Sequence, residues 1–204
     1  MTNSEKHWGE VYTTKASDAV SWFQETPKPS LHALNTLGAR PDQSLIDIGG
    51  GASTLVDALL DRGWSDLSVL DISDAALAES KRRLGSRANV VEWVVADITE
   101  WAPQRSHEIW HDRAVFHFLT DPNHREAYKE RLREVLVSKG AAIIATFAPH
   151  GPERCSGLPV QRYDADGLAT EFSRELEKTG DWTEDHVTPG GHKQAFTWCV
   201  FRRR

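Results

Sequence analysis

Apolar runs alternate along the chain with longer stretches in which apolar residues recur at helical spacing. Strands and helices in this order predict a parallel sheet with helices on both faces. The run at residues 140–147 is the most uniformly apolar, which fits an interior strand covered on both faces. The expected parallel strands are residues 43–48, 67–70, 90–96, 107–111 and 140–147.

Helical stretches fill the intervals between these runs. Pro27 and Pro29 break the chain between the first two helices, and Pro122 begins a long one. Ser73 is placed to cap another helix, with Asp74 in its first turn, where a negative charge suits the helix dipole. The expected helices are residues 15–25, a segment after Pro29 that ends near Gly38, 53–61, 73–84, 122–137 and 164–176.

The tail of the chain has a different pattern. Residues 182–187 and 194–201 read as strands, and Pro189-Gly190-Gly191 between them predicts an antiparallel hairpin at the sheet edge. With the five earlier strands, this hairpin gives a doubly wound, seven-stranded mixed sheet of the α/β class. No repeat or linker divides the 204 residues, so a single domain is expected.

Composition and charge argue against nucleic acid, metal and membrane as partners. The net charge is −6 and Arg202–Arg204 form the only dense basic run, so nucleic acid is not an expected partner. Cys155 and Cys199 lack metal-ligand spacing, which favours a reducing compartment and no metal site. The first residues lack a signal-peptide pattern, and no window approaches the roughly 18 apolar residues of a membrane span. We therefore expect a cytoplasmic protein without a membrane partner.

The turn after the first expected strand carries the strongest functional signal. In LIDIGGGAS, Asp47 lies two residues before Gly49, Gly50 and Gly51, and Ser53 follows as the next helix begins. Glycines let a backbone approach a ligand and adopt conformations barred to other residues. A carboxylate repels a pyrophosphate, and the G-x-G-x-x-G spacing is absent, so the motif argues against a dinucleotide. We expect Asp47 to orient the turn or to accept a hydrogen bond from an amino group.

Two more carboxylates follow at the ends of the next strands. Asp71 ends the second strand about 20 residues beyond the glycines, where a carboxylate can accept from both ribose hydroxyls. Asp97 ends the third strand and can accept from an adenine amino group, while Ile72 and Ile98 pack on the purine faces. The alternative for Asp97 is a loop carboxylate that turns toward Thr99.

Together these segments resemble the class I S-adenosylmethionine-dependent methyltransferases, from about residue 40 to the end of the chain. The resemblance implies a Rossmann-like sheet with a terminal antiparallel hairpin and S-adenosylmethionine as cofactor, leaving S-adenosylhomocysteine as product. In that family the glycine turn passes under the methionine part, the carboxylate after strand two binds the ribose, and the Asp–apolar pair after strand three holds the adenine. The residues that match these roles are Asp47, Gly49, Gly51, Asp71, Asp97 and Ile98.

Candidates for chemistry cluster after the fourth strand. Methyl transfer needs mainly alignment and exclusion of water, although a proton must leave an amine or hydroxyl acceptor. Asp112 is expected beside the methyl group, as a cofactor contact and a catalytic residue, and His117 is a candidate base or a structural histidine. Arg113 could pair with an acidic substrate or with Asp112. Phe116 could form a pocket wall or belong to the core.

Two further segments could enclose an acceptor. The polar loop at 148–163 should overhang the carboxyl ends of the strands, and its His150, Cys155 and Tyr163 are candidates to line the acceptor pocket. Trp8 and Tyr12 lie four residues apart and can share one helical face. We expect residues 1–38 to form a helical lid over a cofactor-binding core at 39–204; the alternative is that these aromatic side chains pack against the sheet.

The acceptor is not legible in the sequence. We favour a small molecule, because the predicted lid and loop can enclose a modest pocket. A protein lysine is the alternative acceptor. From other classes, the chain could be a nicotinamide-dependent oxidoreductase, or could hold S-adenosylmethionine or S-adenosylhomocysteine without turnover.

Overall fold

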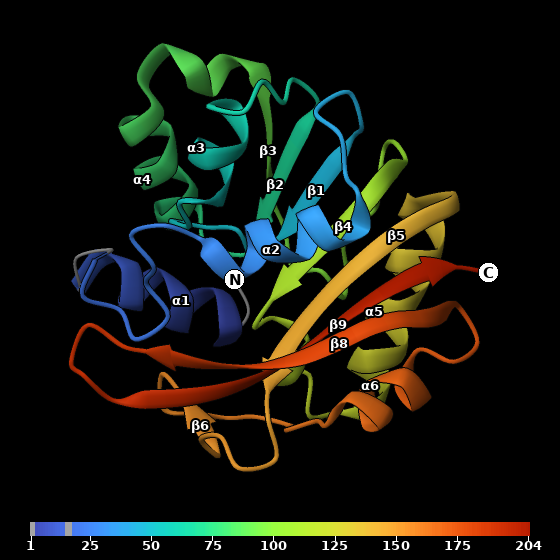
Figure 1. The fold of residues 1–204 in the computed structure, drawn as a ribbon. Helices are drawn as coiled ribbons and strands as arrows, with labels where there is room; N and C mark the ends of the chain where they lie inside the picture. The colour runs from blue at the N-terminus through green and yellow to red at the C-terminus, as the bar shows by residue number, and fades with distance from the viewer. Residues whose placement is uncertain (1–2, 15–17) are drawn as a thin grey trace.

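The computed structural model describes residues 3–14 and 18–204, and its centre is a seven-stranded sheet with the order β3-β2-β1-β4-β5-β9-β8 (Figure 1). β1 to β5 run parallel, β9 is antiparallel to β5, and β8 is antiparallel to β9. The predicted mixed sheet with a terminal hairpin is therefore confirmed. The strands are β1 (Leu45–Ile48), β2 (Leu67–Asp71), β3 (Val91–Val95), β4 (His107–Arg113), β5 (Leu136–Phe147), β8 (Leu176–Val187) and β9 (Lys193–Arg203).

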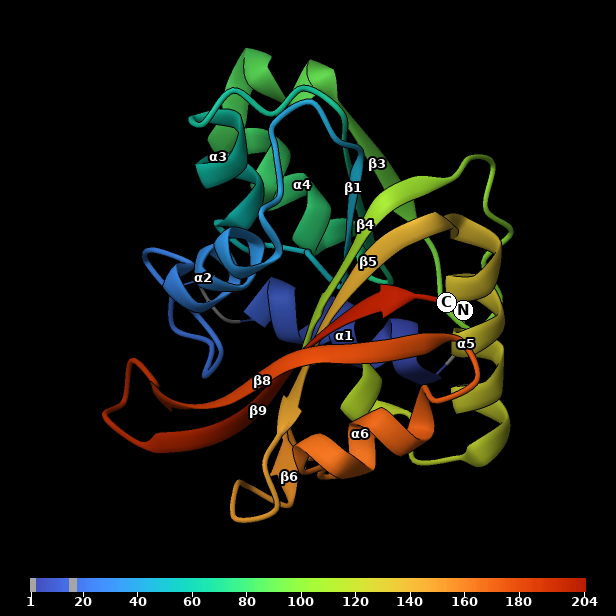
Figure 2. The same cartoon turned by 45° about the vertical axis from the view of Figure 1, so that its right-hand side comes forward.

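Helices cover both faces of this sheet. Alternate residues of a strand point to opposite faces, so Leu45 joins one apolar cluster and Ile46 the other. The first cluster packs under α2 (Lys28–Leu37), α3 (Leu55–Leu60) and α4 (Asp74–Leu84). The second packs under α5 (Pro122–Val135) and α6 (Ala165–Glu171), which Figure 2 shows on the other side of β4 and β5. The remaining elements are two 3₁₀ turns, η1 (Gly85–Val90) and η2 (Phe116–Phe118), and a small antiparallel pair, β6 (Arg154–Cys155) with β7 (Leu158–Pro159).

The N-terminal region differs from the prediction. A helix, α1 (Asn3–Thr14), lies at the carboxyl ends of β1, β2 and β4 in Figures 1 and 2. The helix predicted over 15–25 is wrong for its described part: residues 18–26 form turns and bends, and 15–17 lie outside the described residues.

The carbonyl groups of this turn segment explain why it is not helical. The Trp22 carbonyl accepts from the Arg113 guanidinium at 3.0 Å, and the Gln24 carbonyl accepts from the Thr54 hydroxyl at 2.9 Å. In a helix, these carbonyl groups would accept hydrogen bonds from the helix's own backbone. Because they accept from Arg113 and Thr54 instead, tertiary hydrogen bonds override the local helical pattern.

Several boundaries also move: β5 begins at Leu136, four residues before its predicted start, and the two largest shifts lie between α6 and β8. α6 ends at Glu171, not near residue 176, and β8 begins at Leu176, six residues before the predicted start. β8 is the edge strand and pairs only with β9, so most of its side chains are polar and its extent leaves little apolar signal. Ser73 caps α4 as predicted, its Oγ accepting from the Ala76 amide at 3.3 Å. Across the described residues, every helix is too short or too polar to cross a membrane.

Candidate functional site

Two adjoining cavities lie where the strand order reverses between β1 and β4. Helices leave the sheet toward opposite faces at such a point, which opens a crevice outside the carboxyl ends of the strands. The larger cavity has a volume of about 350 Å³ and the smaller one about 50 Å³. The residues that line both cavities are Tyr12, Trp22, Ile48, Gly49 and Arg113.

The glycine turn makes room for the protein's own carboxylates. A Cβ atom on Gly50 would lie 2.6 Å from Asp47 Oδ2, and one on Gly51 would lie 2.6 Å from Asp71 Oδ2. Gly49 and Gly51 have φ angles of +67° and +32°, which L side chains rarely adopt. The turn therefore requires glycine both for its conformation and because two buried carboxylates pack against it.

Asp71 and Asp97 both face the larger cavity from neighbouring strand ends. Asp71 is 6% exposed, accepts from the Ser73 amide at 2.8 Å, and burial raises its pKa to about 7. One oxygen of Asp97 accepts from the Thr99 amide and hydroxyl at 2.9 and 2.7 Å. Asp97 therefore both turns toward Thr99 and lines the larger cavity. The apolar neighbours expected beside these carboxylates, Ile72 and Ile98, line the same cavity.

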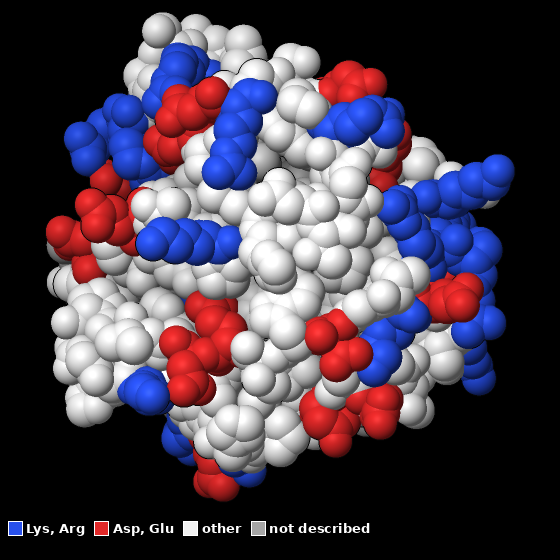
Figure 3. Space-filling model, viewed as in Figure 1, with Lys and Arg blue, Asp and Glu red and all other residues white. Residues whose placement is uncertain are grey.

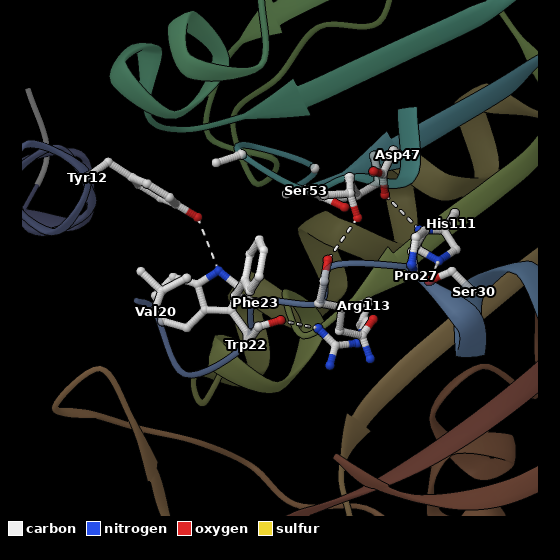
Figure 4. A pocket seen from close by; sticks show the side chains of 16 residues that line it. Tyr12, Val20, Trp22, Phe23, Pro27, Ser30, Asp47, Ser53, His111 and Arg113 are labelled. Atoms are coloured by element: carbon white, nitrogen blue, oxygen red, sulfur yellow. Dashed lines mark hydrogen bonds and ion pairs between the residues drawn. The ribbon is translucent and has the colours of Figure 1, made fainter. Parts of the chain in front are cut away.

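The smaller cavity contains a buried chain of three polar side chains that Figure 4 shows together. His111 Nδ1 lies 2.7 Å from Asp47 Oδ1, and His111 Nε2 lies 3.0 Å from Ser30 Oγ. The sequence interpretation assigned no role to His111 or Ser30. The available signal was register, because Asp47 and His111 are direct partners in the pairing of β1 with β4. Ser53 lines this cavity, as expected of a residue that follows the glycine turn.

Asp112 lies beneath the site, outside the walls of both cavities. It is fully buried and accepts from the Val115 and Phe116 amides at 2.8 and 3.0 Å and from the Tyr128 hydroxyl at 2.6 Å. Burial raises the pKa of Asp112 to about 6. Two of these hydrogen bonds hold the backbone that follows β4, and the third ties Asp112 to α5.

His117 also lies in the core, outside both cavity walls. Its Nδ1 accepts from the Phe147 amide at 3.2 Å, and burial lowers its pKa to about 3. A neutral imidazole with so low a pKa is a poor proton acceptor at neutral pH. This environment fits the structural alternative for His117.

The predicted substrate contacts divide into two groups. Trp8, Tyr12 and Arg113 line the larger cavity, whereas Phe116, Tyr163 and His150 line neither cavity. Phe116 and Tyr163 pack on each other in the core with ring centroids 5.7 Å apart, and His150 is exposed on the surface. Alternation along β4 and the turn after it explains the difference, since Arg113 and Phe116 point toward opposite faces of the sheet.

Aromatic side chains close the cavity on the side of α1. Trp8 makes edge-to-face contacts with Trp22 and Phe118, at centroid separations of 5.7 and 5.1 Å. The Trp22 indole N–H donates to the Tyr12 hydroxyl at 3.3 Å. Four residues from β5, β6, β7 and β9 form the opposite wall: Phe147, Cys155, Leu158 and Phe196. The sequence interpretation had singled out Cys155 among them and missed the other three.

Comparisons with known proteins show that the chain is similar to methyltransferases. Residues 45–140 match the family model described as "Methyltransferase domain". The malonyl-[acyl-carrier protein] O-methyltransferase of Anoxybacillus flavithermus is 24% identical over 178 residues, which are 84% of this chain and 66% of that protein. The mouse eEF1A lysine and N-terminal methyltransferase is 27% identical over 97 residues, 48% of this chain and 14% of that protein. The chain thus spans less than two thirds of either relative.

Solved structures share the complete fold. An S-adenosylmethionine-dependent methyltransferase from Anabaena variabilis superimposes with a TM-score of 0.77 at 16% identity, covering 100% of this chain and 96% of that one. The N-methyltransferase NodS of Bradyrhizobium japonicum, in complex with S-adenosylhomocysteine, gives 0.72 at 14% identity, covering 98% and 99%. The chain thus shares the fold of these methyltransferases, and its residues 45–140 match the methyltransferase-domain model.

Proposed function

We propose that this protein is an S-adenosylmethionine-dependent methyltransferase, which binds the cofactor along the glycine turn and transfers its methyl group to a small molecule in the larger cavity. The observation that carries the proposal is that Asp71 and Asp97 face one cavity of about 350 Å³ from adjacent strand ends. Asp71 accepts from the ribose hydroxyls and Asp97 from the adenine amino group. Ile72 and Ile98 pack on the purine.

The methionine part lies over the glycine turn, toward the smaller cavity. Asp47, held by His111, provides a negative charge for the ammonium group of the methionine part. Ser53, which follows the glycine turn, lines the same cavity. The bound cofactor supplies a methyl group on a cationic sulfur, which is already a good leaving group. The protein's task is therefore alignment and exclusion of water.

The acceptor lies between the aromatic cluster of α1 and the wall formed by β5, β6, β7 and β9. Trp8 and Phe118 on one side and Phe147 and Phe196 on the other give this part an apolar lining that excludes water. A cavity of about 350 Å³ with such a lining supports a small acceptor over an extended protein surface. Asp112 and His117 act as positioning residues, because their hydrogen bonds hold the backbone around the cavity.

The surface charge agrees with such an acceptor. On the face drawn in Figure 3, basic side chains are interspersed with acidic ones and do not form a continuous basic surface. The net charge of −6 points the same way, because a phosphate backbone requires clustered positive charge. Nucleic acid is therefore not proposed as the acceptor.

Calorimetry tests the cofactor assignment. We expect S-adenosylmethionine and S-adenosylhomocysteine to bind to the wild-type protein, and NADH not to bind. Asp71→Asn should weaken S-adenosylhomocysteine about 10- to 100-fold, because hydrogen bonds to a charged group contribute about 1.5–3 kcal/mol. Asp74→Asn is the matched control, since Asp74 is an exposed residue three positions further on and should leave the affinity unchanged. Binding of NADH alone would sink the proposal.

A methyl-transfer screen tests the acceptor class. Radiolabelled S-adenosylmethionine is incubated with the enzyme and either a library of small molecules or a protein extract. Label in small molecules supports the proposal, and label confined to protein lysines would replace it with the lysine alternative. Cofactor binding without transfer to either class would identify a non-catalytic binding protein.

A further inference from the structure

The guanidinium group of Arg113 is buried in the wall shared by the two cavities, and it is only partly paired. Its Nη1 donates to the Trp22 carbonyl at 3.0 Å, while Nε and Nη2 are buried without a hydrogen-bond partner. Buried N–H groups of a charged side chain are costly to leave unsatisfied. An acceptor atom supplied by a ligand would remove this cost.

No carboxylate among the described residues forms an ion pair with Arg113. The two carboxylates whose negative charges act on the Arg113 guanidinium are those of Glu184 and Asp47, and both already have other partners. Glu184 accepts from Gln24 at 3.0 Å and from Trp198 at 2.7 Å, and Asp47 pairs with His111. Among the described residues, the Arg113 guanidinium thus stands at the edge of the cavity without a directly paired carboxylate.

The guanidinium group of Arg113 packs against a residue of the acceptor-side wall. Its central carbon lies 4.7 Å from the ring centroid of Phe196, which lines the larger cavity but not the smaller one. In Figure 4 it lies apart from Asp47 and Ser53, which mark the glycine turn. Arg113 therefore contacts the acceptor-side wall, while it also lines the smaller cavity with Asp47 and Ser53.

We propose that Arg113 binds a carboxylate of the methyl acceptor, so that the acceptor is a small organic acid; the proposal rests on the proposed function. The fork of Nε and Nη2 matches the two oxygens of a carboxylate. The positive charges in the cavity also favour an anionic acceptor. The cofactor brings a cationic sulfur into the same cavity, so an anionic acceptor balances two positive charges, whereas a cationic one would add a third.

Calorimetry on protein saturated with S-adenosylhomocysteine tests this assignment. The probes are a panel of aliphatic and aromatic carboxylic acids, each paired with its primary amide, such as benzoate with benzamide. We expect at least one acid to bind about tenfold or more tightly than its amide, as a charge-assisted pair requires. Arg113→Met should abolish that preference and Arg113→Lys should retain part of it. Arg82→Met, which removes an exposed positive charge from α4, should leave it unchanged.

Binding of the cofactor product separates the two sources of a carboxylate. We expect Arg113→Met and Arg113→Lys to bind S-adenosylhomocysteine as the wild-type protein does. If both lose affinity for it but keep affinity for 5′-methylthioadenosine, which lacks the carboxylate, Arg113 holds the cofactor and the proposal is overturned. A panel in which no acid binds better than its amide also overturns it. Failure of the wild-type protein to bind S-adenosylhomocysteine is a distinct result, because it rejects the proposed function itself.

Discussion

His111 Nδ1 lies 2.7 Å from Asp47 Oδ1, a contact between neighbouring strands that buries a carboxylate beside the glycine turn. Asp47 is 4% exposed and His111 2% exposed, so neither group can replace the other with water. Gly50 packs against the same carboxylate. The pair therefore fixes the position of a charge at the floor of the smaller cavity.

A double-mutant cycle measures this pair. Removing either partner leaves a buried polar group unsatisfied, so Asp47→Asn and His111→Phe should each destabilise the fold by about 1–3 kcal/mol. The double variant should lose less than the sum of the two, with a coupling of about 1–3 kcal/mol in urea unfolding. Ser30→Ala is the control, because it removes only the bond to Nε2. Additive single effects would mean that the contact contributes no coupling energy.

The affinity for S-adenosylhomocysteine should rise with pH through the ionisation of Asp71. Burial holds the pKa of Asp71 at about 7, and the ionised form accepts from the ribose hydroxyls more strongly than the neutral acid. Below that pKa the affinity should fall about tenfold per pH unit, which makes it about 30-fold weaker at about pH 5.5 than at about pH 8. Calorimetry across this range checks the slope. Asp71→Asn should abolish it, and a slope retained in that variant would assign the titration to another group.

Gly49→Ala should destabilise the protein for two separable reasons. The new Cβ would lie 2.1 Å from Val115 Cγ2, and φ at this position is +67°. Backbone strain contributes about 1–2 kcal/mol and overpacking about 1–3 kcal/mol. Gly63→Ala isolates the first cause, because φ is +83° there and nothing lies within 4 Å of its Cβ position. Val115→Ala should recover part of the loss at Gly49, and no recovery would contradict the steric explanation.

His117 should make the fold sensitive to acid. Burial lowers its pKa to about 3, below the 6.5 of an unfolded histidine, so the unfolded chain binds a proton first as the pH falls. The histidine's contribution is fully present above about pH 6.5 and is lost toward about pH 3. Relative to His117→Asn, the wild-type protein should lose about 2 kcal/mol between about pH 7.5 and about pH 5 in urea unfolding. An equal pH dependence in both proteins would show that this imidazole does not titrate as described.

The sequence by itself determined the positions where strands meet turns. Local rules act there: apolar runs define β1 to β5, and the glycines of the first turn are required by positive φ angles and by neighbouring carboxylates. Because the carboxyl ends of parallel strands meet at one edge, Asp71 and Asp97 could be placed in one site before any contact was known. Both line the larger cavity.

Only the tertiary structure decided which side chains after β4 face that cavity. Alternation along the strand separates Asp112 from Arg113, but the sequence does not say which face is covered by helix and which is left open. Packing of α5 buries Asp112. The Trp22 carbonyl, in the turn segment at 18–26, holds Arg113 at the cavity wall. These contacts join residues about 16 to 90 positions apart, beyond the reach of any local pattern. Local periodicity thus specified the scaffold, and long-range packing selected the residues that line its site.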